Sequence, residues 1–199
     1  MKKLLFAILS IFILSMTGQA QANLITNGSF EQGTTGWTVG GGGIDVVSGW
    51  QASDGNYSID LNAFMPGFVE QTFTTVAGQQ YVVAFDLSGN PGEPRGEKTL
   101  DVSVDAYFNT FSYNTLVKGN TNGNMLYDSY SFSFVADDGF ATLRFFSTTA
   151  GNLGHPADAQ GPVLDNILVN PVPEPATMLL LGAGLVGLAG ARRRFGKSS

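Results

Sequence analysis

The amino-acid sequence predicts an all-β domain, a jelly roll or β-sandwich of about eight to ten strands, between two short apolar segments that are not part of the fold. The first indication is a period of two: between residues 100 and 108 apolar and polar residues alternate, so that one face of the strand is apolar and the other is wet. The second is that clusters of Gly, Pro, Asn and Asp separate such runs. The third is that no stretch of the domain has a convincing helical period.

The other strands follow from the same alternation. Residues 81–87 have two faces of low polarity, which predicts a central strand. The remaining strands are expected at 24–30, 58–61, 68–73, 130–134, 143–145 and 163–169. In a closed sandwich the first and the last of these strands are expected to pair or to lie side by side.

Turn chemistry defines the connections. The segments 76–79 and 137–139 each contain a Gly next to small or acidic residues, and they predict hairpins. Residues 89–96 and 119–124 predict longer loops. We find no internal repeat and no linker between residues 23 and 170, so a single domain is expected there.

Charge is distributed unevenly along the chain. Residues 23–170 contain four basic and 15 acidic residues, a formal charge of 4 − 15 = −11. An acidic domain repels phosphate backbones, which argues against nucleic acid as a partner. It attracts cations, and Ca²⁺ prefers carboxylate and carbonyl oxygens. The chain has no Cys, which excludes disulfides and thiolate metal sites.

The N-terminus, residues 1–22, has the features of a secretory signal peptide. Two Lys residues follow the initiator Met, and residues 4–16 are apolar. Ala20 and Ala22 then form an A-x-A site for signal peptidase. The alternative, a retained membrane anchor, is less consistent with so short an apolar run.

The C-terminus, residues 171–199, combines the tripeptide Pro173-Glu174-Pro175, an apolar run at 176–191 and a cluster of three Arg. As a helix the run spans about 24 Å, less than the ~30 Å hydrocarbon core. Arginines that snorkel at its cytoplasmic end help it to fit and leave the domain outside.

This terminal segment resembles the PEP-CTERM sorting signal. The resemblance implies transient attachment to the inner membrane, removal of the segment by an exosortase, and a final location at the cell surface or in the extracellular matrix. An ordinary single-span anchor is the alternative.

The middle of the chain resembles the choice-of-anchor C domain, which is similar to DUF642 domains. The residues that carry the resemblance are Asn23–Glu31, Gly36–Val39, Ile44–Val47, Ser53–Gly55, Ser58–Leu61, Gly89–Pro91 and Gly161–Ile167. Domains of this kind look like galactose-binding jelly rolls, so the resemblance implies a fold used by many carbohydrate-binding modules. It does not define a ligand, because this fold hosts many functions.

The sequence gives little support for catalysis. There is no Cys nucleophile and no G-x-S-x-G motif, and His155, the one imidazole, lies in a loop. Carboxylates are plentiful, so a glycosidase with two acids about 5–10 Å apart stays open as an alternative. Acids that alternate along strand exteriors are more simply explained as a solvated face, and we expect no enzyme activity.

A calcium site is the better-supported expectation. Glu31 ends the first motif of the domain and Asp165 lies in the last strand. If these two segments are neighbours, both carboxylates can reach one cation, with backbone carbonyls completing the shell. Asp54 and Asp60 are weaker candidates, and the alternative is that all these acids are simply solvent-exposed.

Sugar binding requires exposed aromatic faces with polar groups beside them. Trp50 lies in a Gly/Ser loop and is the main stacking candidate, and Tyr57, seven residues further on, could add to the same surface. Trp37 is either a ligand residue or, more simply, part of the core. Outward-facing Tyr residues elsewhere would extend such a surface: Tyr107, Tyr113 and Tyr127.

The leading hypothesis is therefore an exported, non-catalytic surface protein that binds extracellular polysaccharide. The alternatives are a structural adhesin that contacts proteins or itself, and a polysaccharide hydrolase.

Overall fold

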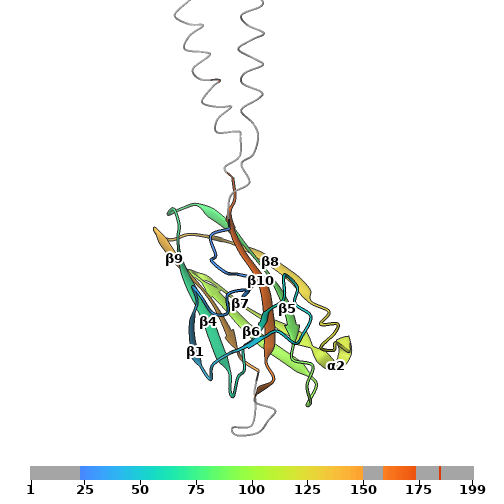
Figure 1. The fold of residues 1–199 in the computed structure, drawn as a ribbon. Coiled ribbons are helices and arrows are strands. Elements are labelled where there is room, and N and C mark those ends of the chain that lie inside the picture. The colour runs from blue at the N-terminus through green and yellow to red at the C-terminus, as the bar shows by residue number, and fades with distance from the viewer. Residues whose placement is uncertain (1–22, 150–158, 174–183, 185–199) are drawn as a thin grey trace, which may run out of the picture. The chain divides into compact units, whose positions relative to one another are not determined.

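The computed structural model describes residues 23–149, 159–173 and Gly184, and in them the predicted all-β fold is confirmed. Ten strands form two five-stranded antiparallel sheets (Figure 1). Sheet A has the order β1 (Thr38–Gly41), β4 (Gly67–Thr74), β9 (Phe140–Ser147), β6 (Glu97–Val104) and β7 (Tyr107–Asn114). Sheet B has the order β2 (Asp45–Val47), β3 (Ser58–Asp60), β10 (Pro162–Pro171), β5 (Gln80–Gly89) and β8 (Asp128–Val135).

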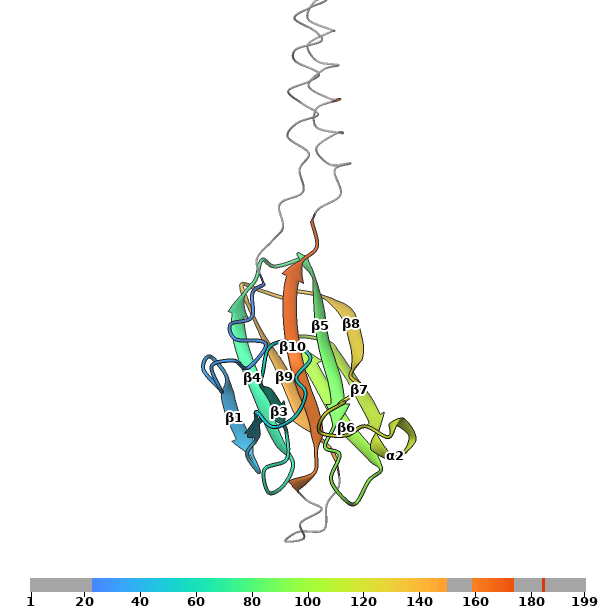
Figure 2. The ribbon, with the colours of Figure 1, turned by 45° about the vertical axis from the view of Figure 1, so that its right-hand side comes forward.

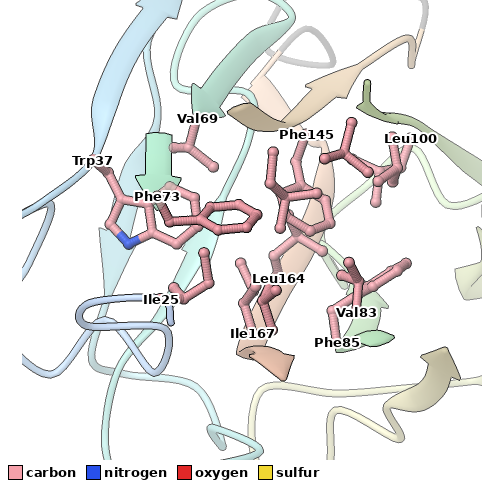
Figure 3. Packing of buried hydrophobic residues seen from close by; sticks show 14 of the residues in the cluster. Ile25, Trp37, Val69, Phe73, Val83, Phe85, Leu100, Phe145, Leu164 and Ile167 are labelled. Atoms are coloured by element: carbon pink, nitrogen blue, oxygen red, sulfur yellow. The ribbon is translucent and has the colours of Figure 1, made fainter. Parts of the chain in front are cut away.

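The hydrophobic core lies between the sheets. Along β5, the central strand expected at 81–87, the inward side chains of Tyr81, Val83, Phe85 and Leu87 are buried. Figure 3 shows how side chains of the two sheets meet: Val83, Phe85, Leu164 and Ile167 from sheet B and Val69, Phe73, Leu100 and Phe145 from sheet A. Complete burial of one such side chain contributes about 1.5–3 kcal/mol, so this layer is what holds the sandwich together.

The two expected hairpin turns are crossings between the sheets instead. The turn at 76–79 joins β4 of sheet A to β5 of sheet B, and the turn at 137–139 joins β8 of sheet B to β9 of sheet A. The two crossings bond to each other: Thr75 N–H donates to Gly139 O (2.9 Å) and Gly78 N–H donates to Ala136 O (2.8 Å). The turn residues were identified correctly, but local chemistry does not determine which sheet the next strand joins.

The long strand expected at 100–108 is two strands. The chain reverses at Asp105–Ala106, where Asp105 has a left-handed φ of 48°, and Val104 pairs with Tyr107. The apolar alternation continues across the turn and hides it in the sequence. Strand β7 is followed by a helix that was not expected, α2 (Thr115–Lys118), one turn capped by the Asn114 side chain.

Residues 24–30 do lie beside the last strand, as expected, but they do not form a strand. Leu24 N–H donates to Val169 O (2.9 Å) and Ile167 N–H donates to Gly28 O (3.0 Å). Asn27, with a left-handed φ of 55°, interrupts the extended conformation. At Gly28 the segment approaches β10 so closely that a Cβ would stand 2.0 Å from Ile167 O, which explains the Gly.

Several predictions for the chain ends fall outside the described residues. They are the signal peptide 1–22 with Ala20 and Ala22, the sorting-motif residues Glu174 and Pro175, and the apolar run 176–191, of which only Gly184 is described. His155, in an internal segment, also lies outside the described residues. In the part of the chain that the structure describes, no helix reaches the length and apolarity needed to cross a membrane.

Candidate functional site

The candidate site is the loop between β2 and β3, residues 48–57, which carries Trp50 and Tyr57. Asp165 of β10 anchors its middle. Its Oδ2 accepts the backbone N–H groups of Ser53 (2.7 Å) and Asp54 (2.9 Å). Asp165 is fully buried, and burial raises its pKa to about 6 against the lowering effect of these N–H donors.

Asp86 of β5 lies opposite Asp165 in the strand register and binds the same loop. Its carboxylate accepts hydrogen bonds from the hydroxyls of Ser53 and Ser129, the latter at 2.6 Å. Asn166 Nδ2 donates to it as well (3.0 Å). The sheet therefore holds Ser53 through its backbone and through its hydroxyl.

Glu31 fixes the other end of the loop from the N-terminal segment. Its Oε1 accepts the N–H groups of Asn56 (2.6 Å) and Tyr57 (2.8 Å), and these bonds lower its pKa. Gly55 lies between the residues held by Asp165 and those held by Glu31. It has a left-handed φ of 80°, and a Cβ at this position would stand 2.4 Å from Glu31 Oε1. The Ser-Asp-Gly sequence thus allows the carboxylate to reach the backbone beyond it.

A second loop, residues 119–127, lies against the first. Gln51 N–H donates to Asn122 O (2.7 Å), and Gln51 Oε1 accepts from Met125 N–H (3.1 Å). Met125 is fully buried, and its carbonyl accepts from the hydroxyl of Tyr113 (3.0 Å). The residue next to Trp50 is therefore fixed to a loop that is itself held to the core.

The predicted aromatic residues separate into surface and core. Trp50 is half-buried and Tyr57 is 37% exposed, so both reach solvent on the anchored loop. Trp37 is only 8% exposed; its ring lies 5.5 Å from that of Phe30 and its indole N–H donates to Asn27 O (3.0 Å). Trp37 is thus a core residue and cannot offer a face to a ligand.

The three Tyr residues proposed as additions do not extend the surface of this loop. Tyr113 is buried, and Tyr127 is partly buried: its hydroxyl lies out of contact with solvent, and desolvation raises its pKa. Tyr107 lies in β7, where its ring stacks on Phe132.

Sequence reasoning missed the role of Asp60, whose side chain is 1% exposed at the end of β3. It accepts the N–H groups of Asn62 (2.9 Å) and Gly161 (3.0 Å) and the amide of Asn90 (2.7 Å). Burial raises its pKa to about 7. Asp60, Asn90 and Gly161 all belong to the motifs that suggested a family, so they could have been grouped.

The predicted calcium ligands are brought near one loop, but not as a metal shell. Glu31 and Asp165 face N–H donors of residues 53–57, and a cation would have to replace those donors. In the described parts of the chain no three Asp, Glu, His or Cys residues gather closely enough to hold a metal. As placed, these residues do not fit a calcium site, and calcium binding stays a prediction.

The described residues thus form a two-sheet β-sandwich module that carries an anchored loop on sheet B. The solved structures that share this fold include two carbohydrate-binding modules. TmCBM61 in complex with beta-1,4-galactotriose has a TM-score of 0.54 at 15% identity and covers 76% of this chain and 99% of its own. A structure described as Family 16 Carbohydrate Binding Module-2 has a TM-score of 0.51 at 17% identity and covers 74% and 99%.

The chain belongs to the DUF642 family, described as a protein of unknown function, whose family model matches residues 19–170. A PEP-CTERM protein-sorting motif matches residues 171–194. Both resemblances seen in the sequence are thereby confirmed. The sorting motif indicates export, exosortase processing and display at the cell surface.

The chain is also 28% identical over 179 residues to halomucin of Haloquadratum walsbyi. The match covers 79% of this chain but 2% of halomucin, so the relative is far longer than the part it shares.

Proposed function

We propose that this protein is a non-catalytic carbohydrate-binding protein of the cell surface, and that its ligand is an extracellular polysaccharide contacted by the loop 48–57. The observation that carries the proposal is the aromatic pair Trp50 and Tyr57 on a loop anchored by three carboxylates. The likeness of the fold to carbohydrate-binding modules supports it.

The anchoring matters for affinity. A sugar ring gains from stacking on an aromatic face and from hydrogen bonds to polar groups next to it. The exposed residues Gln51 and Asn56 are next to Trp50 and Tyr57 in the chain, and Asn122, also exposed, is hydrogen-bonded to the backbone of Gln51. Because Asp86, Asp165 and Glu31 already hold the loop, little conformational entropy is lost when a ligand binds.

The carboxylates near the loop support a binding role rather than hydrolysis. A glycosidase acid must face the scissile bond. Asp60, Asp86 and Asp165 are buried beneath the loops, and each accepts several hydrogen bonds from the protein itself. They serve to hold loops in place.

The domain without its terminal segments is suitable for a direct test, because residues 21–171 form one compact unit with its own core. The purified domain is incubated with the host's exopolysaccharide and with a glycan array. We expect retention on at least one glycan, reduced about tenfold or more by Trp50→Ala.

Phe140→Ala is the matched control, since this ring is 66% exposed at the opposite end of the strands and should leave retention unchanged. Absence of retention on every glycan contradicts the proposal and favours an adhesin for protein partners. Release of reducing ends from the native polymer would favour a hydrolase.

A further inference from the structure

One side of the sandwich is formed by two long edge strands. Strand β7 is the last strand of sheet A and β8 the last of sheet B, and each has eight residues. In the described chain β7 pairs with β6 alone. The edge strands on the other side, β1 and β2, have four and three residues. Short edges offer little to a pairing strand, whereas an eight-residue edge offers a row of backbone N–H and C=O groups.

Aromatic side chains close the gap between these two edge strands. Tyr107 of β7 stacks on Phe132 of β8, with ring centroids 3.8 Å apart and planes at 3°. Phe111 of β7 meets Tyr130 of β8 at 4.9 Å. All four rings are partly exposed. The two edges are therefore tied together and present one surface, which we call the aromatic edge.

Strand β7 carries no charged residue, and in β8 only the first residue, Asp128, is charged; it forms an ion pair with Lys118. Residues 106–117 and 129–136 contain no Asp, Glu, Lys or Arg, within a domain whose formal charge is −11. Two copies of such a domain repel each other over most of their surfaces. At this edge they can meet without placing like charges together.

Strand β7 lacks the usual protection of an edge. It has no Lys, no Pro and no irregularity in its register with β6. Two local side-chain contacts use some of its backbone groups: Thr110 N–H donates to Asn109 Oδ1 (3.0 Å), and Ser112 O accepts from Tyr130 Oη (3.4 Å). Both contacts are exposed and are easily exchanged for a backbone hydrogen bond.

We propose that the aromatic edge is a self-association surface, on which β7 pairs antiparallel with β7 of a second copy about a two-fold axis near Phe111. Pairing joins two A sheets into one and covers Phe108, which is 65% exposed in the single copy. Strand addition of this kind gains affinity from main-chain hydrogen bonds. Attachment of many copies to one surface raises their effective concentration, so that a weak contact suffices.

The proposal goes beyond carbohydrate binding and is tested by sedimentation velocity of the domain across a range of protein concentrations. We expect a monomer–dimer equilibrium, weakened about tenfold or more by Phe108→Lys, because a Lys on an edge strand must give up contact with water when the strands pair and no longer supplies the ring that pairing covers. Phe140→Lys is the matched control, because Phe140 is 66% exposed on the same sheet but away from the edge. A domain that stays monomeric at millimolar concentration overturns the proposal, as does an equal effect of both substitutions.

Cysteine cross-linking identifies the pairing strand independently, since the chain has no Cys of its own. Thr110→Cys, on β7, is expected to give dimers with a short bismaleimide. Thr142→Cys, on β9 of the same sheet and also exposed, is expected to give none. Efficient cross-linking of the Thr142→Cys variant but not of the Thr110→Cys variant would place the interface elsewhere and refute the assignment.

Discussion

Asp60 makes the stability of the domain depend on pH in a direction opposite to that of an ordinary paired carboxylate. Its side chain is 1% exposed, and burial raises its pKa from 3.8 to about 7 against three hydrogen bonds that lower it. The neighbouring Asp45 raises the pKa further. The buried Lys98 lies close enough for its own pKa to be affected by Asp60.

The folded state therefore binds the Asp60 proton more tightly than the unfolded state does. This contribution to stability is complete below pH 3.8 and is lost as the pH rises through about 7. The gap between about 7 and 3.8 corresponds to about 4 kcal/mol, at about 1.4 kcal/mol per pKa unit. Between about pH 4.5 and 8, about 3 kcal/mol of it is lost.

Asp60→Asn removes this pH-dependent contribution to the free energy of unfolding. The substitution also lowers the free energy of unfolding by about 1–3 kcal/mol at every pH, because the new side-chain amide faces the donor Nδ2 of Asn90. Urea unfolding of both proteins at about pH 4.5 and 8 separates the two effects. The variant should gain about 3 kcal/mol relative to the wild type between these pH values. A difference between the two proteins that does not change with pH would refute the reasoning.

Three further outcomes follow from the loop site and the core. Gly55 and Gly78 both have a φ of 80°, but only at Gly55 would a Cβ strike Glu31, so Gly55→Ala should reduce glycan retention more than Gly78→Ala does, as measured by affinity electrophoresis. Trp37→Ala should cost about 3–5 kcal/mol in urea unfolding, and Trp50→Ala should cost clearly less because part of its ring is in solvent; equal losses would contradict the assignment of Trp37 to the core and Trp50 to the surface. If Ca²⁺ binds in place of the N–H donors of the loop, it should raise the melting temperature of the wild type but not that of Asp165→Asn. Calorimetry with Ca²⁺ or EGTA measures this difference, and an unchanged melting temperature of the wild type argues against calcium binding.

The strands could be predicted where one face packs on the core, because burial of alternate residues imposes a period of two. Residues 81–87 and 163–169 are such cases. The turn at Asp105–Ala106 was missed because the apolar alternation continues through it. The partner of each strand was not predictable either, since the turns 76–79 and 137–139 have the same chemistry in a hairpin as in a crossing between sheets.

The candidate site was predictable in part. Glu31 and Asp165 were expected to meet because the segments that contain them were expected to be neighbours, and both do bind the loop 48–57. Their hydrogen-bond partners could not be predicted, because every residue except Pro has a backbone N–H and the sequence does not indicate which of these groups a carboxylate binds. Which of Trp37 and Trp50 keeps part of its ring in contact with solvent depends on tertiary packing, which the local composition does not determine.

Strand β10 links the site to the way in which the protein is displayed. Asp165, which anchors the loop, lies near its beginning at Pro162, and its end at Pro171 leads directly into the sorting motif that starts at residue 171. Ten residues of strand extend about 30 Å. Strand β10 lies beside β5 (Figure 2) and pairs with it from Pro162 to Pro171. The second loop is likewise held at the far end of β5, where Asn120 Nδ2 donates to Gly89 O (2.7 Å). The proposed sugar-binding loops therefore contact the half of β10 and β5 that lies nearer Pro162 and Gly89, whereas the chain continues into the sorting motif from the other end of β10.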